Sequence, residues 1–305
     1  MERAADASER YLLVLVLAIA AAGAAGPGPG RALAAGNGID AALAVLVFAT
    51  GLSIRLADLA AVRLAWRRIA VVLGVSTAAL PALAWAASLL IGDLELRSGM
   101  QAVGVAPAEV ATVALCVIAG GDAAVCATLL AASTGITVVV AGPILSLLGA
   151  PVIVSSAGLL GNLAVVIALP LATGVALRAA PRAAWSPGPG LDAAVRLVTV
   201  LALLVLLWQV ASQIRLDAAY TRVIIALVAY VAGSAVLGRV LALGAPAGRS
   251  TAVLLPVAMR DFAVAAGIAT AAFGPAAAAP LGAYGVLVLL AGSAVTLIAR
   301  RRPSP

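Results

Sequence analysis

Long apolar segments, separated by short polar stretches, make up almost the whole of this sequence. Ten segments are predominantly apolar and close to the roughly 20 residues that a helix needs to cross the hydrocarbon core of a membrane. They lie at about residues 11–30, 39–54, 69–91, 94–119, 123–149, 154–178, 194–214, 219–242, 252–274 and 279–299. Only 10% of the residues are charged, compared with about 25% in a soluble domain, which argues against a water-soluble fold and against a disordered chain. We therefore predict an all-α integral membrane protein with ten transmembrane helices.

The first of these segments allows a second interpretation. Its clean apolar run, from Tyr11 to Ala25, is short and ends in alternating Gly and Pro at residues 26–30. Such a run is also typical of a signal peptide. The preceding residues carry acidic as well as basic side chains, without the positive bias of a signal peptide, so a first transmembrane helix is the preferred interpretation.

Residue types that are absent exclude several kinds of site. The chain contains no His, which excludes a Ser-His-Asp triad, a Cys-His dyad and a His-based metal site. The two cysteines, Cys116 and Cys126, lie in apolar segments and are interpreted as small buried residues. We predict neither an enzyme nor a bound cofactor or metal. The net charge of +7 does not indicate nucleic acid, because a membrane protein retains Arg in its cytoplasmic loops.

Arginine residues are distributed unequally between the loops. If both termini are cytoplasmic, 14 Arg lie on the cytoplasmic side, Arg260 lies within a segment and four lie on the other side. The four are Arg31, Arg97, Arg215 and Arg222. By the positive-inside rule we expect a multi-pass protein of the inner (plasma) membrane with both termini in the cytoplasm.

The two halves of the chain echo each other weakly. Pro107 in the fourth segment and Pro256 in the ninth lie about half the chain apart, and each is followed within a few residues by ionisable groups. Five segments in each half make the halves inverted relative to one another, as in many secondary transporters. We predict two repeats, residues 1–150 and 151–305, whose fourth and ninth helices are broken near these prolines.

Three charged residues lie inside apolar segments, where each costs about 2.5–3.5 kcal/mol on insertion scales. They are Glu109, Arg260 and Asp261. Such residues usually face a bundle interior or a water-filled cavity and pair with one another. We therefore predict a substrate- or ion-binding site here, together with Pro107 and Pro256. A buried Glu–Arg–Asp cluster that only locks two helices together is the alternative.

Five other polar residues are weaker candidates for the same site. They are Ser76, Thr112, Asp122, Ser133 and Thr134. For Asp122, which follows two glycines between the fourth and fifth segments, a helix N-cap is the preferred alternative. For the four hydroxyl residues, the preferred alternative is a hydrogen bond to the backbone of their own helix.

Three stretches of the sequence carry motifs that resemble those of one known family. Residues 46–53 read Leu-Val-Phe-Ala-Thr-Gly-Leu-Ser, residues 107–134 join a Pro-containing break to a Gly-Gly-Asp turn and a Ser-Thr pair, and residues 256–262 read Pro-Val-Ala-Met-Arg-Asp-Phe. In this order they are similar to the second, the fourth and fifth, and the ninth helices of the bile acid:sodium symporter (BASS, or SBF-like) family. The resemblance implies a core domain and a panel domain, broken fourth and ninth helices that cross in the core, and organic anions carried with sodium. It also adds Met259 to the predicted site.

The sequence departs from the family pattern where the resemblance implies sodium ligands. The family's Asn at the first break, its Glu, Gln and Asn at the second and its Gln in the third helix correspond to Glu109, Pro256, Arg260, Asp261 and Ser76, and two hydroxyls of its fifth helix to Cys126 and Leu130. Two carboxylates and one permanently protonated Arg leave one negative charge when no ion is bound. We expect Arg260 to replace one sodium, and a proton or a single monovalent cation to neutralise the remaining charge.

These observations favour a secondary transporter that carries small organic anions by alternating access, without two sodium ions, and is either coupled to protons or uncoupled. Glu109 or Asp261 would be the titrating group, and Arg260 would replace a sodium or bind the substrate carboxylate directly. A cation/proton antiporter with a related inverted-repeat fold is the alternative, and a non-transporting membrane sensor or assembly subunit is a third. The expected partners are the lipid bilayer and the substrate, without nucleic acid, in a monomer or homodimer.

Overall fold

The computed structural model describes residues 12–34, 37–53, 66–149, 156–180, 189–212 and 218–300, and over these ranges the chain is almost entirely helical, without a named β-strand. Six helical stretches in the described ranges are long and apolar enough to cross a membrane. They are Trp66–Ser88, Ala123–Leu147, Leu160–Ala179, Gly190–Ala211, Tyr220–Leu241 and Pro275–Ala299. The prediction of an all-helical, multi-pass membrane protein is confirmed.

The described helices follow the predicted apolar segments closely. Their bounds are α2 Leu12–Ala25, α3 Pro27–Ala34, α4 Gly38–Ser53, α6 Trp66–Ser88, α7 Leu94–Val105, α8 Ala111–Ile118, α9 Ala123–Leu147, α10 Ser156–Leu163, the π-helical turn η2 Ala164–Ala168, α11 Leu169–Ala179, α12 Pro189–Ala211, α13 Ala218–Leu241, α14 Ala247–Ala258, α15 Phe262–Phe273, the 3-10 turn η3 Pro275–Ala278 and α16 Ala279–Arg300. The first segment differs from its prediction, because α2 stops at Ala25 and a separate short helix begins at Pro27, a residue well suited to a first helical position.

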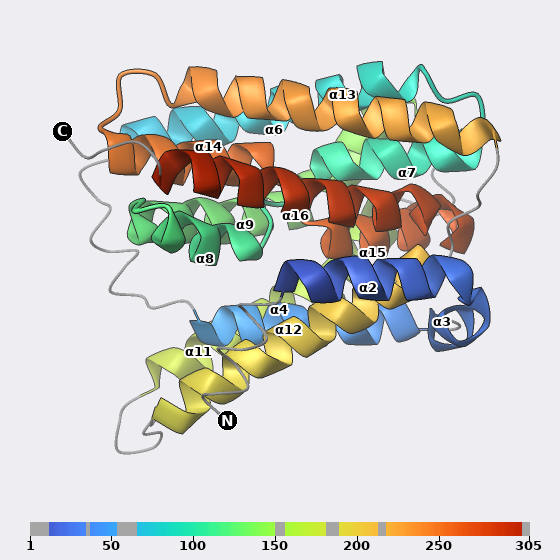
Figure 1. The fold of residues 1–305 in the computed structure, drawn as a ribbon, viewed down its shortest axis with the longest axis horizontal. Coiled ribbons are helices and arrows are strands. Elements are labelled where there is room, and N and C mark those ends of the chain that lie inside the picture. The colour runs from blue at the N-terminus through green and yellow to red at the C-terminus, as the bar shows by residue number, and fades with distance from the viewer. Residues whose placement is uncertain are drawn as a thin grey trace.

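The helices form two groups in space (Figure 1). The smaller helix group contains α2, α3, α4, α11 and α12, which pack mainly on one another; the larger helix group contains α6–α9 and α13–α16. In the smaller group α4 and α11 approach closely at Gly51 and Gly174. A Cβ atom added to Gly51 would lie only 3.1 Å from the Cα of Gly174. Small residues at a helix contact are typical of packing in membranes.

Two helices of the larger group are interrupted. One interruption, at residues 106–110, separates α7 from α8, and the other, at residues 259–261, separates α14 from α15. Ala106, before Pro107, is extended at φ −62° and ψ 154°, as expected because proline disfavours the helical conformation of the preceding residue. The second interruption lies near Pro256, as predicted, although the proline itself is inside α14 and the interruption begins at Met259. Asp261 then starts a new helix by capping α15.

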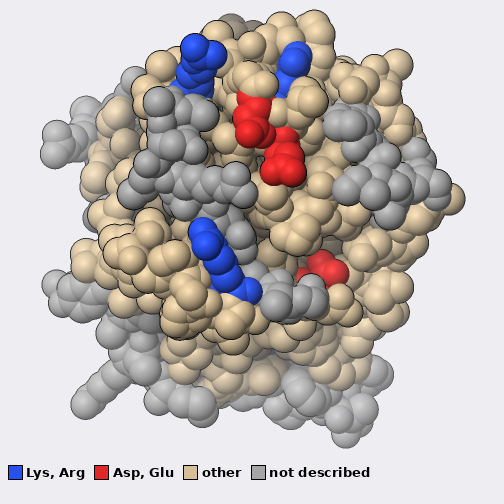
Figure 2. Space-filling view, turned by 90° about the vertical axis from the view of Figure 1, so that its right-hand side faces the viewer, with Lys and Arg blue, Asp and Glu red and all other residues tan. Residues whose placement is uncertain are grey.

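Charged side chains lie at the ends of the helices. At one end Arg249 in α14 forms an ion pair of 3.6 Å with Asp122, and Arg68 in α6 donates to the carbonyl oxygens of Leu241 and Leu243 at the end of α13. Figure 2 shows the opposite end, where α7 and α13 begin and where acidic and basic side chains lie side by side among uncharged ones. Charges at helix ends can reach the membrane surfaces, so they carry little of the cost of a buried charge.

Candidate functional site

The two interruptions cross and are hydrogen-bonded to each other. Ala108 and Arg260 form an isolated antiparallel bridge. The Glu109 amide donates to the Met259 carbonyl at 2.9 Å, and the Asp261 amide donates to the Pro107 carbonyl at 2.8 Å. We call residues 106–110 and 259–261 the crossing. It brings together five of the predicted site residues, although they are far apart in the sequence.

The amide ends of the two half-helices at the crossing are occupied by carboxylates. Oδ1 of Asp261 accepts hydrogen bonds of 2.9 Å from the Ala263 and Val264 amides in the first turn of α15. Oε2 of Glu109 accepts one of 3.3 Å from the Phe262 amide. A helix N-terminus carries roughly half a positive charge, so the start of α15 attracts both carboxylates.

Glu109 lies directly before its own half-helix, α8. Its carbonyl accepts a hydrogen bond of 3.1 Å from the Thr112 amide. Its carboxylate reaches the first residue of α15, where Oε2 accepts from the Phe262 amide. Its second oxygen, Oε1, is buried and has no hydrogen-bond partner.

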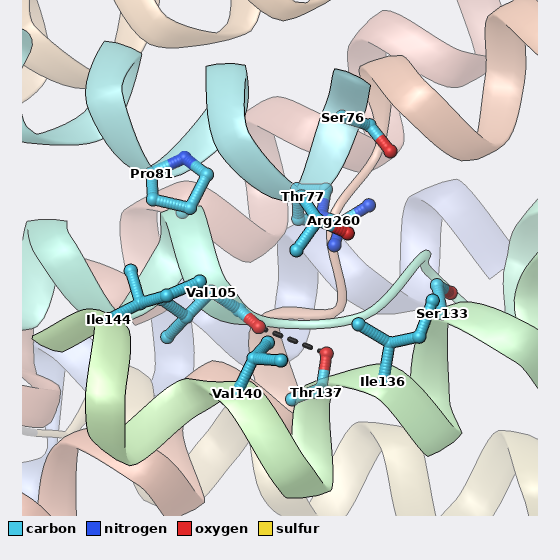
Figure 3. Close-up of a pocket in the computed structure, with 11 residues that line it drawn as sticks. Ser76, Thr77, Pro81, Val105, Ser133, Ile136, Thr137, Val140, Ile144 and Arg260 are labelled. Carbon is cyan, nitrogen blue, oxygen red and sulfur yellow. Dashed lines mark hydrogen bonds between the residues drawn. The ribbon is translucent and has the colours of Figure 1, made fainter. Parts of the chain in front are cut away.

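The carbonyl ends of the other two half-helices are occupied by donors from the protein itself. The Thr137 hydroxyl in α9 donates to the Val105 carbonyl at 3.0 Å (Figure 3). The Ser234 hydroxyl in α13 donates to the Ala258 carbonyl at 3.0 Å. The guanidinium of Arg260 donates through Nη2 to the Ala106 carbonyl. In transporters with broken helices such carbonyls can coordinate the coupling cation; here each of the three accepts a hydrogen bond from a protein side chain.

Arg260 does not form the predicted ion cluster with Glu109 and Asp261. Among the described residues no carboxylate lies within 4.0 Å of its guanidinium. Its side chain instead lines a cavity between α6, α7 and α9, beside Ser76 and Thr77 (Figure 3). The cavity is small, with room for about one water molecule. A Glu–Arg–Asp lock between two helices is therefore not what the structure shows.

The weaker candidates differ in the groups to which they bond. Ser133 links helices, because its hydroxyl accepts from the Ala108 amide at 3.1 Å and donates to its own helix at the Leu130 carbonyl. The Thr134 and Ser76 hydroxyls donate only to carbonyls of their own helices, as the alternative predicts. Asp122 lies beyond the far end of α8, where Oδ1 caps α9 by accepting from the Val125 amide.

The two cysteines are buried, as predicted. Both have free thiols with no exposed surface. Cys116 in α8 and Cys126 in α9 belong to the main apolar cluster of the protein.

Sequence reasoning did not identify four polar residues that lie at or next to the crossing. Thr137 and Ser234 bond to the residues directly before it. The Tyr284 hydroxyl of α16 accepts from the Arg260 amide at 3.0 Å, and the ring of Tyr230 of α13 lies edge-on to Tyr284 with centroids 6.1 Å apart. Buried tyrosine hydroxyls normally find a hydrogen-bond partner. The position of Tyr230 and Tyr284 within apolar segments was the sequence signal that could have identified these two residues.

We expect Thr137→Val to destabilise the fold by about 1–3 kcal/mol, because the isosteric valine leaves the buried Val105 carbonyl without a donor. Thr134→Val is the matched control, because Thr134 lies one turn earlier in α9 and its hydroxyl bonds only to its own helix. Thermal unfolding of the purified protein in detergent measures both. Equal shifts in the two variants would contradict a special role of Thr137 at the crossing.

Comparison with known proteins agrees with this architecture. The family model described as the sodium bile acid symporter family matches residues 41–223, which is more than half of the chain. The match includes α6 to α9 and therefore the first interruption, with Glu109. None of the curated proteins compared with the chain matches it. On the family match, the chain belongs to the sodium bile acid symporter family, whose members are membrane transporters and not enzymes.

Proposed function

We propose that this protein is a secondary transporter of small organic anions that works by alternating access and does not use two sodium ions. The hydrogen bond from the Arg260 guanidinium to the Ala106 carbonyl carries the proposal. It places a permanent positive charge at the carbonyl end of α7, where a coupling cation would otherwise bind. Thr137 and Ser234 donate to two further carbonyls there, which supports a crossing that needs fewer bound cations.

The arrangement of the broken helices supports ten membrane crossings in two inverted repeats, residues 1–150 and 151–305. α7 and α14 have 12 residues each, and both end at the crossing, where Ala108 pairs with Arg260. If α7 with α8 and α14 with α15 each count as one broken span, they are the fourth and ninth spans, and the two spans meet at their breaks. The larger and smaller helix groups then correspond to a core and a panel that move relative to one another.

The distribution of Arg supports an inner-membrane protein with both termini on the cytoplasmic side. Arg68 and Arg249, assigned to the cytoplasmic side, lie at the end where α13 finishes and α14 starts. Arg97 and Arg222, assigned to the other side, lie near the starts of α7 and α13, at the opposite end. Opposite ends for the two sets agree with the positive-inside rule.

Glu109 is the better of the two candidates for a transported proton. In both Asp261 and Glu109 one oxygen accepts from amides of α15, and Glu109 differs in that its second oxygen, Oε1, is completely buried without a partner. A proton can be added to that oxygen without breaking a hydrogen bond. It would neutralise the one negative charge that Arg260 leaves uncompensated at the crossing. Transport is therefore coupled to protons through Glu109, and an uncoupled carrier is the remaining possibility.

Uptake into proteoliposomes tests this function. A panel of radiolabelled short organic acids is first screened by exchange across the membrane, which needs no driving ion. For the acids that exchange, we expect the same initial uptake rate when all sodium is replaced by N-methyl-D-glucamine. A steep sodium dependence, with two sodium ions per turnover, would contradict the proposal.

A further inference from the structure

The two residues that face each other in the crossing do not bond to each other through their amides. Ala108 and Arg260 form the bridge, but the hydrogen bonds between the two interruptions are donated by the next residues, Glu109 and Asp261. Ala108 and Arg260 are both buried, and a buried amide without an acceptor is costly and rare. Their amides therefore need acceptors from other parts of the protein.

Hydroxyl groups of two other helices supply these acceptors. The Ser133 hydroxyl in α9 accepts from the Ala108 amide at 3.1 Å, and the Tyr284 hydroxyl in α16 accepts from the Arg260 amide at 3.0 Å. Ser133 is itself held in place, because its hydroxyl also donates to the Leu130 carbonyl at 2.9 Å. Both hydroxyl residues are buried, so water does not readily replace either bond.

The two hydroxyls occupy matching positions in the two halves of the chain. Ser133 follows Ala108 by 25 residues, and Tyr284 follows Arg260 by 24. α9 is the next α-helix after the half-helix α8, and α16 is the next α-helix after the half-helix α15. The proposed inverted repeats account for this correspondence, because repeats place equivalent residues in equivalent contacts.

Close packing of α16 against the second interruption fixes the position of Tyr284. A Cβ atom on Gly285 would lie 3.0 Å from the Phe262 ring, and one on Gly292 would collide with the Met259 side chain. α16 therefore passes close to the chain on both sides of the second bridge residue. The tyrosine hydroxyl is thus a rigid acceptor and not a mobile one.

We propose that Ser133 and Tyr284 are equivalent positioning residues, which hold the two interruptions as one cooperative unit and keep Arg260 directed at the carbonyl end of α7. Loss of either hydroxyl leaves one amide of the bridge without an acceptor. Because the bridge and its two flanking hydrogen bonds are shared by both interruptions, loosening one interruption also loosens the other. A hydroxyl that anchored only its own interruption would not affect the distant one.

Hydrogen–deuterium exchange of the purified full-length protein in detergent tests this cooperation. Peptides that contain residues 106–112 and 259–264 are followed separately, at temperatures where both exchange in the unmodified protein. In Tyr284→Phe, and likewise in Ser133→Ala, exchange should become about tenfold faster in both peptides, as expected for the loss of one hydrogen bond. Exchange in α12, in the smaller helix group, should not change. Faster exchange only in the peptide whose own amide lost its acceptor overturns the proposal, and so does unchanged exchange in both.

Three further variants separate the two hydroxyls from general effects on packing. Ser133→Thr keeps a hydroxyl and should exchange like the unmodified protein. Thr134→Val removes a hydroxyl that bonds only to its own helix, and Tyr230→Phe removes one that has no partner although its ring packs against Tyr284. Neither should accelerate exchange at the crossing. Acceleration in Ser133→Thr equal to that in Ser133→Ala would contradict the role of the hydroxyl.

The consequence for Arg260 rests on the transport function proposed above and is measured separately. If both hydroxyls keep its guanidinium in place of a cation, sodium-free uptake should fall in Ser133→Ala and in Tyr284→Phe, and added sodium should restore part of it. Sodium-insensitive uptake in both variants would overturn the positioning of Arg260. A steep sodium dependence of the unmodified protein would instead contradict the proposed function, while the exchange rates still decide whether the crossing is one unit.

Discussion

Arg260→Gln is expected to reduce organic-anion uptake in sodium-free medium by at least about tenfold, the effect of losing one charge-assisted hydrogen bond in a buried site. The glutamine can still reach toward the Ala106 carbonyl, but it carries no charge. The negative charges of Glu109 and Asp261 would then repel each other without the nearby positive charge of Arg260. In this variant no positive charge lies beside the partial negative charge at the carbonyl end of α7. A sodium ion could bind there, so addition of sodium should restore part of the lost uptake.

Proteoliposomes with and without sodium measure both effects, at equal amounts of reconstituted protein. Arg249→Gln is the matched control, since it removes the same charge from an ion pair of 3.6 Å whose Arg side chain is 53% exposed. Exposed ion pairs contribute little, so its uptake should remain near that of the unmodified protein. Uptake in Arg260→Gln that equals the Arg249→Gln level, with no response to sodium, would exclude Arg260 as a substitute for a cation.

The elements of the fold were predictable from the sequence because their signals are local. Apolar length predicted the helices, and Pro107 with Glu109 marked the first interruption. Pro256 was a less accurate guide to the second, since a helix can continue past a proline for a few residues. In α14 it does so for two, up to Ala258. The capping carboxylate of Asp261 marks that interruption more directly.

The separation of Arg260 from the two carboxylates follows from the pairing of the interruptions, which no local pattern contains. Successive side chains of an extended segment point to opposite faces. In the antiparallel bridge Ala108 lies opposite Arg260, so both belong to one face, whereas Glu109 and Asp261, each one residue further on, belong to the other. Knowledge of this register would have corrected the predicted cluster.

The remaining polar contacts depend on packing between helices that are distant in the sequence. Ser and Thr in apolar helices usually bond to their own backbone, and Thr134 does so. Thr137, one turn from Ser133, instead reaches the Val105 carbonyl of another helix, and Ser234 bonds both to its own helix and to the Ala258 carbonyl. Only the distance between helices distinguishes these residues, and sequence spacing does not provide it.

The second large effect is expected for Glu109→Gln, which should abolish accumulation driven by a proton gradient while exchange of substrate persists. With one proton per monovalent anion, an inward gradient of one pH unit should accumulate substrate about tenfold, since a tenfold ratio corresponds to about 1.4 kcal/mol. In Glu109→Gln the accumulation should fall to the level without a gradient. The side-chain oxygen can still accept from the Phe262 amide, so the crossing keeps its shape.

Asp261→Asn is the matched comparison at the same crossing. Asn caps a helix about as well as Asp, so the bonds from the Ala263 and Val264 amides survive and the proton response should be retained. Uptake with and without a pH gradient, and after addition of a protonophore, separates coupling from exchange. A response lost in Asp261→Asn and kept in Glu109→Gln would assign the proton to Asp261. The fully buried, unpartnered Oε1 of Glu109 is the reason to expect the opposite result, because a charged oxygen that is buried without a hydrogen bond is costly and a proton removes that charge.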